Sequence, residues 1–149
     1  MADRACSPMS IEIGGCLAAG DRDTFVAIVN DEGLSTDWEG GAFTADEVPD
    51  GAALRLHAHE VAWGRVERLE GFCLERAMPF VRWSGGYAGS FSPEIVAFTG
   101  EDEPREFAAG EDELPVICRA TAKRLRSYEA IIAYFHAAEF AVPPLVVGP

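Results

Sequence analysis

Between residues 53 and 77 the spacing of apolar residues changes from every second position to every third or fourth position. This change limits the folds that the chain can adopt. Residues 53–59, ALRLHAH, alternate strictly, with Leu54, Leu56 and Ala58 on one side and Arg55, His57 and His59 on the other. This alternation predicts a half-buried strand. From Glu60 onward, apolar residues recur at spacings of three and four, which predicts a helix carrying Ala62, Val66, Leu69, Cys73 and Ala77 on one face.

The other predicted elements also mix strands and helices. Asp21 or Asp23 can cap a first helix that ends at Gly33, and Thr44 to Glu47 has the spacing of a capping box. Turn residues separate short strands near 10–15, 79–84, 94–99 and 104–108, and a helical pattern near the end has a break and a new cap at Ser127. We therefore predict an α+β, two-layer domain with a mostly antiparallel sheet and about three helices packed on one face.

The size of the chain predicts a single domain over residues 1–149. Its 149 residues are 48% hydrophobic, which is enough apolar material for one core. No apolar run approaches the roughly 18 residues of a membrane span. We expect residues 1–8 to be flexible and residues 141–149 to form an extended tail.

Charge and cysteine usage indicate a compartment and exclude some partners. The net charge of −13 repels phosphate backbones and anionic lipid, so we expect neither direct nucleic-acid binding nor membrane binding. The four cysteines are scattered and no apolar leader opens the chain, which suits free thiols in a reducing cytoplasm. Arginine supplies all but one of the basic residues, a bias typical of GC-rich bacteria and their mobile genetic elements.

Two segments, 31–50 and 101–113, hold most of the clustered negative charge. A dense row of carboxylates can occupy a basic groove on another protein, with fast and salt-sensitive association. In charge character alone the chain resembles antirestriction and anti-CRISPR proteins, which implies an inhibitor of a nucleic-acid-handling protein. The simpler interpretation is a solubilising surface. The predicted partner-binding residues are Asp31, Glu32, Asp37, Glu39, Asp46, Glu47, Asp50, Glu101, Asp102, Glu103, Glu111, Asp112 and Glu113.

His57 and His59 form the one pattern that suggests a metal. Two residues apart on a strand face the same way, so their imidazoles could share an ion. The spacing from Gly51 to His57 and His59 resembles the start of a cupin motif, but Trp63 and Gly64 stand where a cupin has its glutamate. We favour histidines that face solvent or a partner. The alternative function is a small enzyme or ligand-binding domain on the face of Arg55, His57 and His59.

Two Trp-x-Gly-Gly sequences suggest aromatic platforms for a ligand. Trp38 precedes Gly40 and Gly41, and Trp83 precedes Gly85, Gly86 and Tyr87. An aromatic ring beside glycine backbone offers contact area and close approach. Trp38, Trp83 and Tyr87 are therefore candidate ligand contacts, although core tryptophans beside ordinary turns would look the same.

The usual enzyme signatures are missing. The chain has no nucleophile elbow, phosphate loop, dinucleotide-binding glycine motif or zinc-protease helix, so we favour a non-enzymatic protein that needs no cofactor. A third alternative is a homo-oligomeric subunit that uses its apolar surface and the basic cluster of Arg119, Lys123, Arg124 and Arg126.

Overall fold

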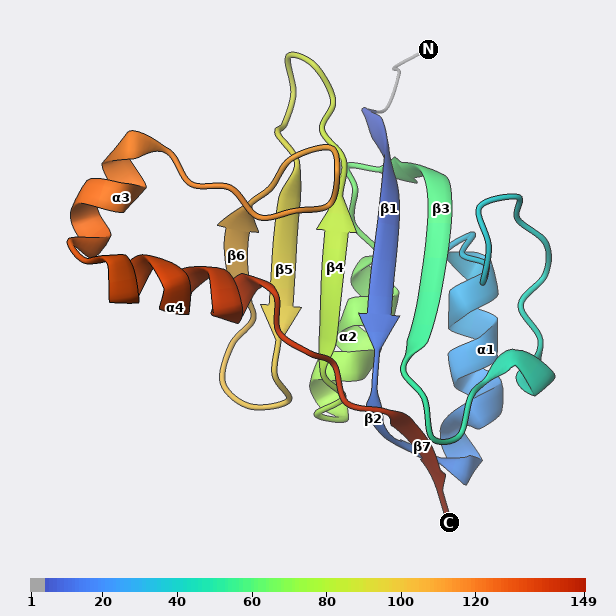
Figure 1. Ribbon diagram of the computed structural model, residues 1–149. Coiled ribbons are helices and arrows are strands. Elements are labelled where there is room, and N and C mark those ends of the chain that lie inside the picture. Colours follow the sequence, from blue (N-terminus) through green and yellow to red (C-terminus); the bar gives the residue numbers. More distant parts are fainter. Residues whose placement is uncertain (1–4) are drawn as a thin grey trace.

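A computed structural model of the chain, described here over residues 5–149, is built on a five-stranded antiparallel sheet. The strand order is β3-β1-β4-β5-β6 (Figure 1). β4, β5 and β6 are the strands predicted near 79–84, 94–99 and 104–108, and they pair as an antiparallel meander. The bounds are Cys6–Ile13 for β1, Leu54–Ala62 for β3, Phe80–Ser84 for β4, Glu94–Phe98 for β5 and Arg105–Ala108 for β6.

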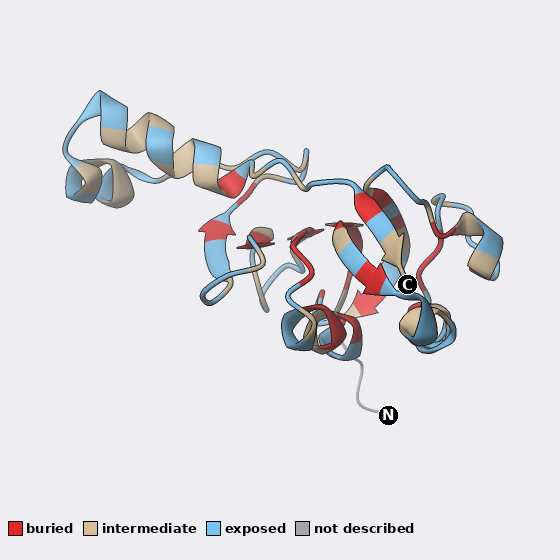
Figure 2. Cartoon of the chain, turned by 90° about the horizontal axis from the view of Figure 1, so that it is seen from below, coloured by how far each residue is buried: buried red, intermediate tan, exposed pale blue. Residues whose placement is uncertain are grey.

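Two helices cover one face of the sheet, and two others project beyond its edge. α1 (Arg22–Asp31) and α2 (Glu67–Glu75) form the second layer, which confirms the α+β, two-layer class. α3 (Arg119–Leu125) and α4 (Tyr128–Ala138) form an arm beyond β6 (Figure 1), and Figure 2 shows this arm on the opposite side of the sheet from α1 and α2. The prediction of about three helices on one face therefore holds for two of them. The break at Ser127 is confirmed, because its hydroxyl accepts a hydrogen bond from the amide of Ala130.

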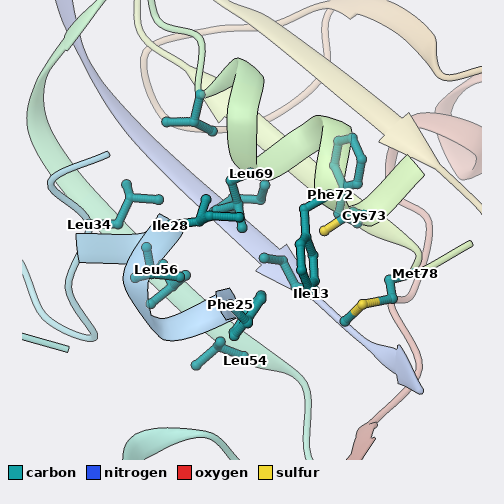
Figure 3. Packing of buried hydrophobic residues seen from close by; sticks show 14 of the residues in the cluster. Ile13, Phe25, Ile28, Leu34, Leu54, Leu56, Leu69, Phe72, Cys73 and Met78 are labelled. Atoms are coloured by element: carbon teal, nitrogen blue, oxygen red, sulfur yellow. The ribbon is translucent and has the colours of Figure 1, made fainter. Parts of the chain in front are cut away.

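The main core lies between the sheet and the α1–α2 layer (Figure 3). Phe25 of α1 contacts Phe72 of α2 with ring centroids 5.5 Å apart, and Leu54 and Leu56 of β3 point toward them as the alternation predicted. Each fully buried side chain of this size contributes about 1.5–3 kcal/mol through removal of apolar surface from water. A second cluster, around Trp83, Ile95 and Phe107, lies on the opposite face beneath the end of α4.

The helix predicted from Glu60 begins later than expected. β3 continues to Ala62, and α2 starts only at Glu67. The pairing of β1 with β3 shifts between Ser7 and Met9, so that β3 has one extra residue there. This bulge makes the inward residues Ala58 and Val61 three positions apart, a spacing that matches a helix.

The two ends of the described chain also take part in pairing. β1 begins at Cys6, so the strand includes the last three residues of the segment that was expected to be flexible, and residues 1–4 lie outside the described range. Within the segment expected to be an extended tail, β7 (Leu145–Gly148) pairs in parallel with β2 (Gly15–Ala18). A Cβ atom on Gly14 would lie only 1.8 Å from the carbonyl oxygen of Pro143, so the two segments approach closely at a residue without a side chain.

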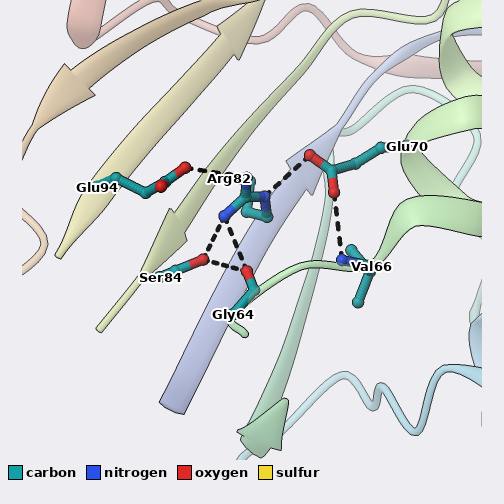
Figure 4. A network of polar contacts seen from close by, with 6 residues as sticks. All are labelled: Gly64, Val66, Glu70, Arg82, Ser84 and Glu94. Atoms are coloured by element: carbon teal, nitrogen blue, oxygen red, sulfur yellow. Dashed lines mark hydrogen bonds and ion pairs between the residues drawn. The ribbon is translucent and has the colours of Figure 1, made fainter. Parts of the chain in front are cut away.

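A buried arginine links the sheet to α2 (Figure 4). Arg82 of β4 is 3% exposed and donates hydrogen bonds to Glu70 of α2 at 2.9 Å and to Glu94 of β5 at 3.2 Å. It also donates to the carbonyl oxygen of Gly64, at 2.8 Å, and to the hydroxyl of Ser84. The second carboxylate oxygen of Glu70 accepts from the amide of Val66 at the start of α2. A buried guanidinium that is satisfied in this way fixes the position of the helix on the sheet.

Candidate functional site on the uncovered face of the sheet

The face of the sheet opposite α1 and α2 carries two rows of side chains. We call it the uncovered face, because α1 and α2 do not cover it. Because the strands are paired in register, Ser10 of β1 lies between His57 of β3 and Trp83 of β4. In the next row, Glu12 lies between Arg55 and Val81. The alternation of β1 produces this arrangement, since Met9, Ile11 and Ile13 point to the opposite, buried side.

The loop between β6 and α3, residues 109–118, is held against this face (Figure 1). One carboxylate oxygen of Glu113 accepts hydrogen bonds from the hydroxyl of Ser10, at 2.6 Å, and from the guanidinium of Arg55, at 2.8 Å. The indole of Trp83 donates to the carbonyl oxygen of Gly110 at 2.9 Å. These bonds connect the loop to three strands, and the charge of Arg55 is neutralised by Glu113.

A pocket of about 200 Å³ remains between the sheet, this loop and the end of α4. Val81, Trp83 and Ile95 contribute apolar surface, and Glu12 and Glu139 contribute carboxylates. Within residues 5–149, neither of these two carboxylates forms an ion pair or a hydrogen bond. The pocket therefore has an excess of negative charge beside an apolar floor.

Trp38 covers the two predicted metal ligands. Its ring lies 4.6 Å from that of His57 and 5.1 Å from that of His59, measured between centroids. Burial, and next the positive charge of Arg55, lower the pKa of His57. The histidines do share a face, as predicted, but no group of three or more His, Cys, Asp or Glu residues suited to a metal occurs in the described part of the chain. The geometry does not supply the third ligand that a zinc site needs.

Of the three aromatic residues predicted to contact a ligand, Tyr87 lies apart from the other two, because Trp38 packs against the apolar cluster that contains Trp83. Trp38 lies over the β3 edge, and Trp83 is in the middle of the sheet, where it lines the pocket but is 7% exposed. Tyr87 is 44% exposed in the β4–β5 connection, where it stacks on Phe91. They do not form one platform.

Seven of the thirteen acidic residues predicted to bind a partner accept hydrogen bonds within the chain. Asp31 pairs with Arg68, and Glu47 completes the predicted capping box with Thr44 and also accepts from Thr36. These hydrogen bonds lower the pKa of Glu47. The other five acceptors are Asp37, Asp50, Glu111, Asp112 and Glu113. Much of the acidic sequence therefore stabilises loops and turns.

The remaining six acidic residues differ in their surroundings. Burial raises the pKa of Glu32. In the described range, five carboxylates have no hydrogen-bond or ion-pair partner: Glu39, Asp46, Glu101, Asp102 and Glu103. The residues of segment 31–50 lie near the β3 edge, whereas 101–103 form the β5–β6 turn and 111–113 lie over the uncovered face (Figure 1). The predicted acidic residues thus form three separate groups.

Sequence reasoning missed Ser10, Glu12 and Glu139. A signal for the first two was present, because the alternation of Ser10 to Ile13 places both polar side chains opposite the two isoleucines. Glu139 follows α4 and meets the sheet only through the tertiary fold, so no local pattern could place it in the pocket.

No helix formed by residues 5–149 has the length and apolar composition needed to span a membrane. Comparisons of the chain with protein-family models, with curated proteins and with solved structures found no match.

Proposed function

We propose that the protein is a non-enzymatic binding protein whose uncovered sheet face accepts a cationic side chain from the basic surface of a partner protein. The observation that carries this proposal is that the carboxylates of Glu12 and Glu139, which form no ion pair within residues 5–149, lie beside the apolar side chains of one pocket. An arginine or lysine of the partner would supply the missing positive charge, and its alkyl chain would contact the apolar surface.

The size of the pocket favours a side chain over a small-molecule ligand. At about 200 Å³ it is smaller than the roughly 300–1,000 Å³ of typical small-molecule sites. Arg55 cannot serve as an anion-binding group without giving up its ion pair with Glu113. Both features support recognition of a cationic group that a partner presents.

The partner class that suits this chemistry is a protein with a basic nucleic-acid channel. A net charge of −13 would speed association with such a channel and keep the protein from binding nucleic acid itself. The protein would then act as an inhibitor. Its four cysteines are unpaired, which supports a reducing cytoplasm as the place where it works.

The test uses a fluorescently labelled arginine-rich peptide and anisotropy titrations at low and high salt. We expect Glu12→Gln with Glu139→Gln to weaken binding by about tenfold at low salt, because two contacts to charged groups of about 0.7 kcal/mol each are lost. The matched control is Glu39→Gln with Asp46→Asn. It also removes two negative charges, but at sites outside the pocket.

The contrast between the two variants decides the outcome. An equal loss of affinity in both would mean that the peptide responds to net charge alone, and the pocket would then have no specific role. Circular dichroism of each variant should match the parent, since Glu12 and Glu139 have no partners in the described structure whose loss would destabilise the fold.

A further inference from the structure

The helical layer leaves part of the sheet uncovered. α1 and α2 lie beneath β3, β1 and β4, and none of the helices formed by residues 5–149 lies beneath β6 on that side (Figure 2). A groove occurs there, lined by Leu74 of α2 and by Val96 and Phe98 of β5. Leu74 is 41% exposed, so part of its apolar surface is open to solvent in the groove.

Carboxylates surround this apolar groove. Asp102 and Glu103 of the β5–β6 turn line it, together with Glu106 of β6, whose Cα partner on β5 is Val96. None of these three carboxylates has an ion-pair partner within residues 5–149. The groove therefore combines an apolar floor with an acidic border.

The arm formed by α3 and α4 has the complementary character. Among the helical residues of the arm, only Ala138 is buried, so the apolar side chains Ile131, Ile132 and Phe135 remain partly exposed. Residues 119–126 contain no acid, and four of the chain's 12 basic residues lie there: Arg119, Lys123, Arg124 and Arg126.

Of the seven basic residues outside the arm in residues 5–149, four are paired with acids, whereas Arg22, Arg65 and Arg105 form no ion pair. Arg55, Arg68, Arg76 and Arg82 each form an ion pair within the chain. In the described part of the structure, the four basic residues of the arm form none. The arm is therefore a basic, partly apolar element attached to an otherwise acidic protein.

The arm does not fill the groove of its own chain. Tyr134 contacts Phe107 with ring centroids 5.1 Å apart, and Ala138 packs with Trp83 and Ile95, so the base of the arm is held on the opposite face of the sheet. The groove lies on the other side of the same two strands, β5 and β6. A second molecule is needed to bring an arm to it.

We propose that two copies of this chain form a closed dimer in which the arm of each copy occupies the β5–β6 groove of the other. Charge complementarity identifies the occupant, because the basic cluster of residues 119–126 meets the acidic border of the groove while the apolar side chains of α4 cover Leu74. Groove and arm both flank β6, so one two-fold axis beside β6 makes the two contacts equivalent. The groove lies on the opposite face of the sheet from Glu12 and Glu139, and the dimer does not depend on their pocket.

Sedimentation velocity of the full chain at about 100 µM and low salt tests the dimer, with circular dichroism to check folding. We expect a dimer for the parent chain. Lys123→Glu with Arg124→Glu should weaken it by at least about tenfold, and so should Glu103→Lys with Glu106→Lys, because each pair places like charges across the interface. All four positions are exposed, so the fold should survive each change.

The decisive variant combines all four reversals, which restores complementary charges with their signs exchanged. It should recover the dimer to within about threefold of the parent. The matched control, Glu39→Lys with Asp46→Lys at the β3 edge, should leave the dimer intact. A monomeric parent chain, a dimer that ignores either pair of reversals, or a combined variant that stays monomeric would each overturn the proposal.

Discussion

Arg82→Met should be among the most destabilising single substitutions in this protein. Methionine fills a similar volume but leaves the carboxylate of Glu70, whose side chain is 14% exposed, without its cation. Removing one partner of a buried ion pair costs about 3–5 kcal/mol. Glu94, the second carboxylate that loses its cation, is 27% exposed and therefore better solvated. We expect Arg82→Met to lower the free energy of unfolding by about 3 kcal/mol, the lower end of that range. That loss corresponds to a fall in melting temperature of about 10 °C for a chain of this length.

Urea denaturation followed by tryptophan fluorescence measures this loss. Glu70→Gln in the Arg82→Met background should recover about 1–2 kcal/mol, because the uncompensated charge is gone while an acceptor for the amide of Val66 remains. The control is Arg68→Met, which removes an exposed ion pair with Asp31 and should cost less than about 0.5 kcal/mol. A loss below about 1 kcal/mol for Arg82→Met would refute the view that this network holds α2 on the sheet.

Three further substitutions or reactions test other parts of the structure. Gly14→Ala should lower the melting temperature by several degrees, because its Cβ would collide with the backbone near β7; an unchanged melting temperature would contradict that contact. Cys118 should react first with a thiol reagent at pH 8, because a hydrogen bond lowers its pKa, and Cys73 last, because burial raises its pKa to about 12; the opposite order in labelling would contradict this. Trp38→Ala should raise the pKa of His57 in an NMR titration, because desolvation lowers that pKa in the fold and the indole contributes to it. In the parent protein the unfolded chain binds the proton of His57 more readily than the folded chain does, so the contribution of this histidine to stability falls as the pH drops through about 6.5.

The sequence predicted the elements well where one local rule acts alone. The alternation from Leu54 to Ala58, the cap at Ser127 and the capping box of Thr44 and Glu47 depend on neighbouring residues, and all three are confirmed. The end of β3 was wrong because a bulge imitates helical spacing, and the bulge depends on pairing with a strand about fifty residues away. The position of the last two helices could not be predicted, because it depends on which apolar surfaces meet across the sheet.

The candidate site could be predicted only in part. That Arg55, His57 and His59 share a face followed from alternation, but the contact of the Trp38 ring with both histidines did not. Counting acidic residues along the sequence located the negative charge but could not show which carboxylates are paired with a cation in the fold. Glu113 belongs to an acidic run in the sequence, yet its carboxylate binds Arg55, 58 positions earlier. Local composition cannot separate such a structural carboxylate from a free one such as Glu103.

The parallel pair of β2 and β7 has a consequence for the order of folding. Gly15 pairs with Leu145, so the contact joins residues 130 positions apart (145 − 15). Closing so long a loop costs more conformational entropy than closing any hairpin in the sheet. Only the contacts of four residues on each strand offset that cost. These strands should therefore pair last, after the sheet has already shortened the distance between them. A nascent chain would form its five-stranded sheet on the ribosome, and β7 would pair with β2 only once residues 145–148 had left the exit tunnel.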